Sequence, residues 1–382
     1  MTPQALQILL RPVLAPFGAG YGALMALRRS LWEKGLLKGF TPTHPCVAVG
    51  NIAWGGSGKT PLVDWLLSRT AKQGLEAVVL TRGYGARPPV LPFPVSPTST
   101  AEEAGDEPLM LRLRHPASAI LVDPVRARAA RLAEQTLNPD LLVLDDGFQH
   151  LAVKRHLNLV LLRPEDLREE WNRVIPAGSW REPAEALRRA DAFLIKSPLS
   201  HIPSLLPDLR RRLEPYGKPA FTFFLRPGLL RRVHSSSPVD TLLPSGPYAL
   251  VSGVGNPKQV RTTFSKFMGY APAMHCIFPD HHAYTAEDAR RLTELHMPIL
   301  CTSKDAVKLR GMPIANLWEL PVTATFGPAL WTSMPFARWW DNWFAEAREA
   351  LAHKKPAPAP HGFDPTVNTP ESFGAISGQK HA

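Results

Sequence analysis

Short apolar segments alternate with longer mixed segments between residues 46 and 196. Such apolar runs are typical of strands buried on both faces of a parallel sheet, and the longer stretches, such as 61–73 and 125–135, of covering helices. The pattern therefore predicts an α/β fold with a parallel sheet and helices on both faces. The predicted strands are Cys46–Val49, Ala77–Leu80, Ala119–Val122, Leu141–Leu144, Leu159–Leu162 and Phe193–Ile195.

A second, smaller α/β unit is predicted to begin near Pro215. Its clearest elements are strands at Phe221–Leu225, Tyr248–Ser252 and Ile299–Thr302, and a helix at Ala286–Leu295. We therefore expect one domain over residues 39–214 and a smaller one over 215–328. A terminal helix within 329–352 has an aromatic face and is expected to return to the first domain. Its apolar face is formed by Trp339, Trp340, Trp343 and Phe344.

Two further segments are predicted to lack regular structure. Residues 86–100 are rich in Pro, Ser and Thr and are expected to form an exposed loop. Residues 353–382 combine Pro-Ala repeats with polar residues, and this composition predicts a disordered tail.

The N-terminal segment, residues 1–38, is apolar with interspersed basic residues. It has no basic start of the kind that a secretory signal requires, and Pro12, Pro16 and the glycines that follow predict breaks in any long helix. No uncharged apolar run is long enough to span a bilayer, which excludes a polytopic membrane protein. The sequence leaves two interpretations open: amphipathic helices lying on an anionic membrane surface, or a helix packed on the domain itself.

Composition narrows the class of protein. A hydrophobic share of 45% excludes a wholly disordered chain, and the three cysteines, Cys46, Cys276 and Cys301, lie too far apart in sequence to indicate a zinc knuckle or disulfide framework. Lys and Arg number 44 against 33 Asp and Glu, a formal net charge of +11. This charge favours anionic partners, without choosing between nucleotides, nucleic acid, acidic lipid and phosphorylated substrates.

The strongest local motif follows the first predicted strand and precedes a predicted helix. It is a phosphate-binding loop, in which Gly55, Gly56, Ser57 and Gly58 turn the backbone so that its N–H groups point at phosphate oxygens. Lys59 is expected to reach the β- and γ-phosphates, and the Thr60 hydroxyl to ligate Mg²⁺. Ala53 stands where the standard pattern has its first glycine.

Two consecutive carboxylates, Asp145 and Asp146, follow the fourth predicted strand. Ligands collect at the carboxyl edge of open α/β sheets, so this position suits a metal-bound nucleotide. Adjacent carboxylates repel each other unless a cation lies between them, and Mg²⁺ would supply that cation.

These motifs resemble those of the tetraacyldisaccharide 4′-kinases. The resemblance spans roughly residues 5–345 and rests on many short motifs in one order. Besides the loop of residues 55–61, they are Arg82-Gly83-Tyr84-Gly85, Gly105-Asp106-Glu107-Pro108, Asp145-Asp146-Gly147-Phe148-Gln149-His150, Arg181-Glu182-Pro183, Phe278-Pro279-Asp280-His281-His282 and Thr302-Ser303-Lys304-Asp305-Ala306-Val307-Lys308.

The resemblance implies a P-loop kinase-like domain, a smaller α/β domain and an active site between them. It implies that ATP, with Mg²⁺, phosphorylates the 4′-hydroxyl of an acylated glucosamine disaccharide 1-phosphate at the cytoplasmic face of a Gram-negative inner membrane. It also implies that Asp106 accepts the hydroxyl proton together with His281. Without the resemblance, the motif Gly105–Pro108 would rather predict a helix N-cap at Asp106.

Five further residues are assigned around this core. Arg181 is expected to stabilise the transferring phosphoryl group and Arg126 to contact phosphate, although a surface salt bridge is the competing interpretation for each. Gln149 and Tyr84 are expected to shape the site, and Glu107 to help hold the metal.

Other functions remain as alternatives. A nucleotide-switched GTPase or metal-delivery ATPase would share Lys59 and the two aspartates, but would not need Asp106 or His281. A nucleic-acid-binding ATPase is suggested by net charge alone, and no recognised binding motif supports it, so we expect no nucleic-acid partner. We infer no obligate protein partner. Adjacent His281 and His282 are poorly spaced for one transition-metal ion, and none is expected.

Overall fold

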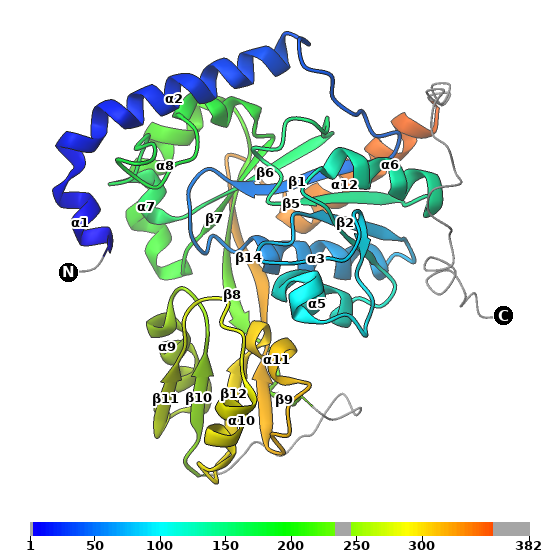
Figure 1. The fold of residues 1–382 in the computed structure, drawn as a ribbon. Coiled ribbons are helices and arrows are strands. Elements are labelled where there is room, and N and C mark those ends of the chain that lie inside the picture. The colour runs from blue at the N-terminus through cyan, green and yellow to red at the C-terminus, as the bar shows by residue number, and fades with distance from the viewer. Residues whose placement is uncertain (1–2, 234–245, 354–382) are drawn as a thin grey trace.

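The structure is a computed structural model that describes residues 3–233 and 246–353 (Figure 1). The predicted tail therefore falls, except for His353, outside the described residues. Two sheets organise the chain, one of nine strands and one of five.

The larger sheet contains seven parallel strands with one antiparallel strand at each edge, in the order β14-β8-β7-β6-β1-β5-β2-β4-β3. The α/β fold class is confirmed, and each of the six predicted strands of the first domain is present, extended by up to two residues. The strands are β1 (Cys46–Asn51), β2 (Ala77–Thr81), β3 (Phe93–Pro94), β4 (Ala119–Val122), β5 (Leu141–Asp145), β6 (Leu157–Leu162), β7 (Ala192–Lys196), β8 (Ala220–Pro227) and β14 (Val322–Leu330).

Helices cover both faces of this sheet (Figure 1). Alternate residues of β1 show the two faces, since Val47 and Val49 pack with α3 (Lys59–Ala71), α5 (Asp106–Arg114) and α12 (Phe336–Ala352). Cys46 and Ala48 pack instead with α6 (Arg126–Thr136), while α8 (Ile202–Leu213) covers the same face further along. Short helices lie in the connections: α4 (Ala101–Ala104), α7 (Pro164–Leu167), η1 (Ala184–Arg189), η2 (Leu199–His201) and η3 (Glu214–Tyr216).

The smaller sheet has the order β11-β10-β12-β13-β9, and only β9 is antiparallel. Helices α10 and α11 pack on one face and α9 on the other. Its elements are β9 (Arg231–Arg232), β10 (Ala249–Ser252), α9 (Pro257–Met268), β11 (Met274–Ile277), α10 (Ala286–Thr293), β12 (Ile299–Thr302), α11 (Ser303–Leu309) and β13 (Leu317–Leu320).

One prediction about the second unit is wrong. The strand expected at Phe221–Leu225 is β8, which pairs in parallel with β7 in the larger sheet rather than opening the smaller one. The Pro-rich connection before it resembles a linker, but Gly217 turns the chain in the left-handed region, at φ +63°, and returns it directly to the sheet. The chain passes to the smaller sheet only after Pro227, and returns through β14.

The N-terminal segment forms α1 (Pro3–Leu9) and one long helix, α2 (Arg11–Glu33). The break expected at Pro16 and the nearby glycines is absent from α2. The close packing of α2 at Gly18 accounts for this continuity. A Cβ at position 18 would lie only 2.9 Å from the carbonyl oxygen of Val174, so this approach requires glycine. The glycines thus let the helix pack closely on the segment 174–183, and that packing outweighs their low helix propensity.

The opposite face of these two helices is apolar and exposed. The side chains of Leu9 and Phe17 are 68% and 66% exposed, and Ile8, Val13, Leu24 and Leu27 are also exposed. One face of the two helices therefore packs on the protein, as the second interpretation expects, and the other face is left open. The membrane-surface interpretation stays a prediction. No helix within residues 3–233 and 246–353 has the length and hydropathy needed to cross a bilayer.

Candidate active site

The predicted phosphate loop lies between β1 and α3, and α3 begins at Lys59. Gly58 adopts φ +93°, a left-handed conformation that side chains disfavour, so glycine is required for this turn. Lys59 Nζ lies 3.1 Å from Oδ1 of Asn51 and 3.4 Å from Oδ1 of Asp146. The N-terminus of α3 and the Lys59 ammonium thus place positive charge at one point of the sheet edge, which suits an anionic ligand.

The two predicted carboxylates lie beside this loop, because β5 pairs with β1 and Asp145 is opposite Val49. Asp145 is buried, and burial, together with the negative charges of Glu107 and Asp146, raises its pKa to about 6. Burial would also raise the pKa of Asp146, but the Lys59 and Arg181 cations lower it overall. Asp146 adopts φ +48°, an uncommon conformation for a residue other than glycine.

Several oxygens near these carboxylates fit a magnesium ion. Oδ1 of Asp145 is buried, and no hydrogen bond reaches it from the part of the chain that the structure describes. The Thr60 hydroxyl donates a hydrogen bond to Glu107, which places both predicted ligands together. In the described ranges, no three His, Cys, Asp or Glu side chains converge to hold a metal unaided. Mg²⁺ at nucleotide sites usually takes only one or two carboxylates, with phosphate oxygens and water completing its shell.

The predicted base, Asp106, is the first residue of α5 and comes into contact with His281 of the loop after β11. His281 Nδ1 lies 3.2 Å from Oδ2 of Asp106. His281 adopts φ +59°, and the ring of Tyr84 lies 5.4 Å away, centroid to centroid. The neighbouring His282 turns away and pairs with Asp288 at 3.1 Å. The geometry therefore favours His281 as the partner of Asp106.

The two predicted arginines both lie at this site. Arg181 Nη1 donates to Asp146 at 2.8 Å and to Gln149 at 3.4 Å. Gln149 Nε2 in turn donates to the carbonyl oxygen of Asn51. Arg126 is buried; burial lowers its pKa, while the nearby charges of Asp146 and Asp145 oppose that effect. Arg181 is therefore partly exposed and paired with Asp146, whereas Arg126 is buried, and the phosphate roles of both stay predictions.

Several site residues were not predicted from sequence. Lys304 forms an ion pair with Glu107, and Lys308 lies 3.1 Å from Oδ2 of Asp106. On the other side of the phosphate loop, Lys196 donates to the carbonyl oxygen of Gly56 at 2.7 Å. The motif of residues 302–308 contained the signal for Lys304 and Lys308, since residues four apart share one face of a helix. Their partners on α5 could not be inferred without the fold.

The same motif resembles a guanine-reading sequence, but its residues are otherwise engaged. Lys304 is paired with Glu107, and Asp305 accepts hydrogen bonds from the backbone of Gly253 and the hydroxyl of Tyr284. These contacts join the two units and stabilise the smaller sheet, and they provide no support for guanine recognition.

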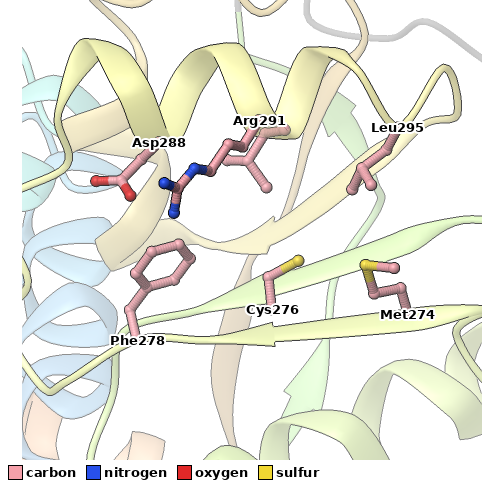
Figure 2. A pocket seen from close by; sticks show the side chains of 7 residues that line it. Met274, Cys276, Phe278, Asp288, Arg291 and Leu295 are labelled. Atoms are coloured by element: carbon pink, nitrogen blue, oxygen red, sulfur yellow. The ribbon is translucent and has the colours of Figure 1, made fainter.

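One hollow adjoins the predicted site, and a second lies in the smaller unit. One, of about 450 Å³, is lined by Arg82, Gly83, Tyr84, Gly85, Ala86, Pro88, Leu91 and Pro124, so it adjoins the ring that packs beside His281. The other, of about 200 Å³, lies between β11 and α10 (Figure 2). Its walls are mostly apolar, from Met274 to Phe278 on one side and Leu292 to Leu295 on the other. None of the predicted site residues lines this second hollow.

Comparisons with known proteins show the family to which the chain is similar. The profile of the family described as tetraacyldisaccharide-1-P 4′-kinase, LpxK, matches residues 10–335. The tetraacyldisaccharide 4′-kinase of Nitratidesulfovibrio vulgaris is 53% identical over 346 residues, covering 90% of this chain and 98% of the relative. That of Oleidesulfovibrio alaskensis is 49% identical, with 89% and 97% covered.

A solved structure is also similar. It is LpxK from Aquifex aeolicus in complex with ATP, with a TM-score of 0.69 and 28% sequence identity. The match covers 88% of this chain and 99% of that chain.

Proposed function

The chain belongs to the tetraacyldisaccharide-1-P 4′-kinase family, and we propose that it performs the reaction for which that family is named. It transfers the γ-phosphoryl group of ATP to the 4′-hydroxyl of a tetraacylated glucosamine disaccharide 1-phosphate, a step of lipid A biosynthesis. One observation carries the proposal: two consecutive residues of α5 connect the phosphate loop to the catalytic dyad. Glu107 accepts a hydrogen bond from Thr60 of the loop, and its neighbour Asp106, the candidate base, contacts His281.

The reaction is an in-line displacement at phosphorus. The 4′-oxygen forms a bond to the γ-phosphorus, the bond from that phosphorus to the β,γ-bridging oxygen breaks, and ADP leaves. Asp106 accepts the hydroxyl proton, and His281 orients the carboxylate through its Nδ1 contact. Lys59 and the backbone N–H groups of residues 55–58 hold the phosphates, and Arg181 neutralises charge on the transferring group.

Mg²⁺ would be held by the Thr60 hydroxyl together with one or two of the carboxylates of Asp145, Asp146 and Glu107, and it would neutralise the phosphates and align them. The raised pKa of Asp145 agrees with this role, because a buried carboxylate beside other carboxylates is stabilised by a cation. Arg126 is proposed to contact phosphate, and Gln149 to hold Arg181 in place. Tyr84, whose side chain is largely exposed beside His281, is proposed to contact the sugar.

The exposed apolar face of α1 and α2 is proposed to lie on the cytoplasmic face of the inner membrane, where an acylated substrate resides. Several cations of α2 are engaged within the protein. Arg11 pairs with Glu170 and Arg28 donates to the carbonyl oxygen of Gln149. Apolar contact therefore contributes more to this docking than charge does, with Lys34 and Lys38 left to attract anionic headgroups.

We also propose that the two sheets form two domains. Within residues 3–233 and 246–353, the chain leaves the larger sheet after β8 and returns to it through β14, which pairs with β8, so the junction lies near residues 227 and 321. The dyad of Asp106 and His281 bridges the two domains.

A transfer assay tests the proposed function. The purified full chain, given labelled ATP, Mg²⁺ and the detergent-dispersed disaccharide 1-phosphate, should produce a lipid with a second phosphate at the 4′-position. Lipid that already carries a 4′-phosphate should accept none. Absence of transfer combined with rapid GTP hydrolysis would refute the proposal and favour a nucleotide switch.

A further inference from the structure

Two lysines of α11 contact two consecutive carboxylates of α5. Lys308 Nζ lies 3.1 Å from Oδ2 of Asp106, and Lys304 forms an ion pair with Glu107. Because the lysines are four residues apart, both project from one face of α11. Helix α11 packs in the smaller sheet unit and α5 in the larger one. The smaller unit thus contacts the candidate base directly, by a route separate from His281.

Lys308 is fixed mainly by residues of its own unit. Its side chain is only 6% exposed, and Nζ lies 5.3 Å from the ring centre of Tyr284 and 3.9 Å from Oδ1 of Asp305. Asp305 is wholly buried and accepts hydrogen bonds from Gly253, Tyr284 and Thr302. No hydrogen bond from the described residues reaches Lys308 Nζ, so these ion pairs and the ring of Tyr284 provide the compensation that a buried ammonium needs.

The shortest contacts with Asp106 are made at one oxygen. Lys308 Nζ and His281 Nδ1 both lie near Oδ2, at 3.1 and 3.2 Å. Within residues 3–233 and 246–353, the side-chain hydrogen bond to Asp106 is made at Oδ2 and none is made at Oδ1. Two fixed contacts at one oxygen restrict rotation of the carboxylate, and the other oxygen keeps its lone pairs for a hydroxyl proton.

We infer that Lys308 is a positioning residue for phosphoryl transfer: it acts through Asp106 by holding Oδ2, so that Oδ1 faces the acceptor hydroxyl. This inference rests on the proposed kinase function. Among the described residues, no hydrogen bond or ion pair joins Lys308 to the phosphate loop or to a predicted metal ligand, so we expect its removal to affect the chemical step and to leave ATP binding nearly unchanged.

The test compares Lys308→Met with the unchanged full chain. Methionine keeps most of the apolar stem that packs on Tyr284 and removes the ammonium. We expect kcat to fall on the order of 10²-fold, the cost of a poorly placed catalytic group, with the KM for ATP within about threefold of the unchanged value. Lys266→Met, at an exposed position on α9, is the matched control and should leave both constants unchanged.

Chemical rescue separates positioning from mere support of the fold. In Lys308→Ala, added ethylammonium should restore part of kcat by occupying the vacated site, whereas it should restore nothing in Asp106→Asn. Should Lys308→Met not fold, Lys308→Arg replaces it, since it keeps the charge but moves the head group and should still lose kcat.

Three results would overturn the inference: a kcat near that of the unchanged chain, a loss expressed mainly in the KM for ATP, or no rescue in folded Lys308→Ala. The unchanged chain is assayed first, which separates the two hypotheses. If it transfers no phosphate, the proposed function fails; if it does and Lys308→Met does equally well, only the positioning role fails.

Discussion

The carboxylate of Asp106 and the imidazole of His281 lie 3.2 Å apart, although 175 residues separate them and they belong to different sheet units. In the proposed mechanism, the larger sheet supplies the nucleotide loop and the base, and the smaller one supplies the groups that orient the base. On that proposal, activity depends on how the two units meet.

Asp106→Asn should lower kcat by about 10²- to 10⁴-fold, because the amide cannot accept the hydroxyl proton. The dissociation constant for ATP, measured by calorimetry, should change little, since no hydrogen bond or ion pair of the described residues joins the Asp106 side chain to the phosphate loop. Glu102→Gln, at an exposed carboxylate on α4, is the control. A variant that mainly loses ATP binding would show that Asp106 has another role.

The adjacent histidines provide a matched pair. His281→Gln should reduce kcat by about 10²-fold, since the dyad loses its imidazole. His282→Gln should leave kcat close to that of the unchanged chain, because His282 contacts Asp288 and Phe278 instead of Asp106. Steady-state transfer rates decide the matter, and equal losses in both variants would contradict the assignment to His281.

His150 should make the protein sensitive to acid. Burial, followed by the charge of Arg126 and other arginines, lowers its pKa to about 4. The unfolded chain, with a pKa near 6.5, then binds more protons than the folded one between these values, so stability falls as the pH drops through that window. At a pH below both pKa values, the free energy of unfolding would be lower by up to about 3 kcal/mol than at neutral pH.

His150→Gln should remove this contribution. Urea denaturation at pH 4.5, 5.5 and 7.5 would show the free energy of unfolding of the variant falling less steeply with acid than that of the unchanged chain. Parallel curves would mean that His150 is not the group responsible.

Phe17→Ser combined with Leu9→Ser should weaken binding to vesicles that contain anionic lipid. Each side chain is more than half exposed on the proposed membrane face, and burying an apolar side chain of this size contributes about 1.5–3 kcal/mol. Phosphoryl transfer to detergent-dispersed substrate should be preserved. Leu229→Ser, also highly exposed but on the smaller unit, is the control.

These point variants test the membrane face better than a deletion of residues 1–38 would. The glycine face of α2 covers the segment 174–183, so a deletion would expose that segment as well as removing the apolar face. Co-sedimentation with vesicles provides the measurement. Binding that is unchanged in the double variant would rule out this face as the docking surface.

Most of the larger sheet could be predicted from sequence, because strands buried on both faces leave uninterrupted apolar runs such as Leu141–Leu144. The sheet to which a strand belongs could not be predicted, as β8 shows. It pairs with β7 because the chain turns back tightly at Gly217, whereas the sequence around Gly217 resembles a linker. The continuity of α2 could not be predicted from sequence either, since it depends on the close approach of Gly18 to Val174.

The residues of the candidate site were likewise predictable only in part. Local patterns predicted the loop around Lys59 and the carboxylates at the end of β5, because each chemistry lies within a few consecutive residues. Lys304 and Lys308 could not be assigned in this way. Their partners are about 200 residues away in the sequence, and the residues on a helix face do not indicate which element that face packs against. The assignments of site residues remain predictions until variants are measured.

The segment beneath α2 is also bonded to the phosphate loop. Ser179 accepts a hydrogen bond from the backbone N–H of Trp54, and the N–H of Arg181 donates to the carbonyl oxygen of Ile52. If α2 lies on a bilayer as proposed, this packing, rather than a flexible tether, would set the height of the reacting phosphorus above the lipid. Acceptors would be sorted by how far their hydroxyl projects from the membrane surface, independently of the affinity of the sugar for the protein.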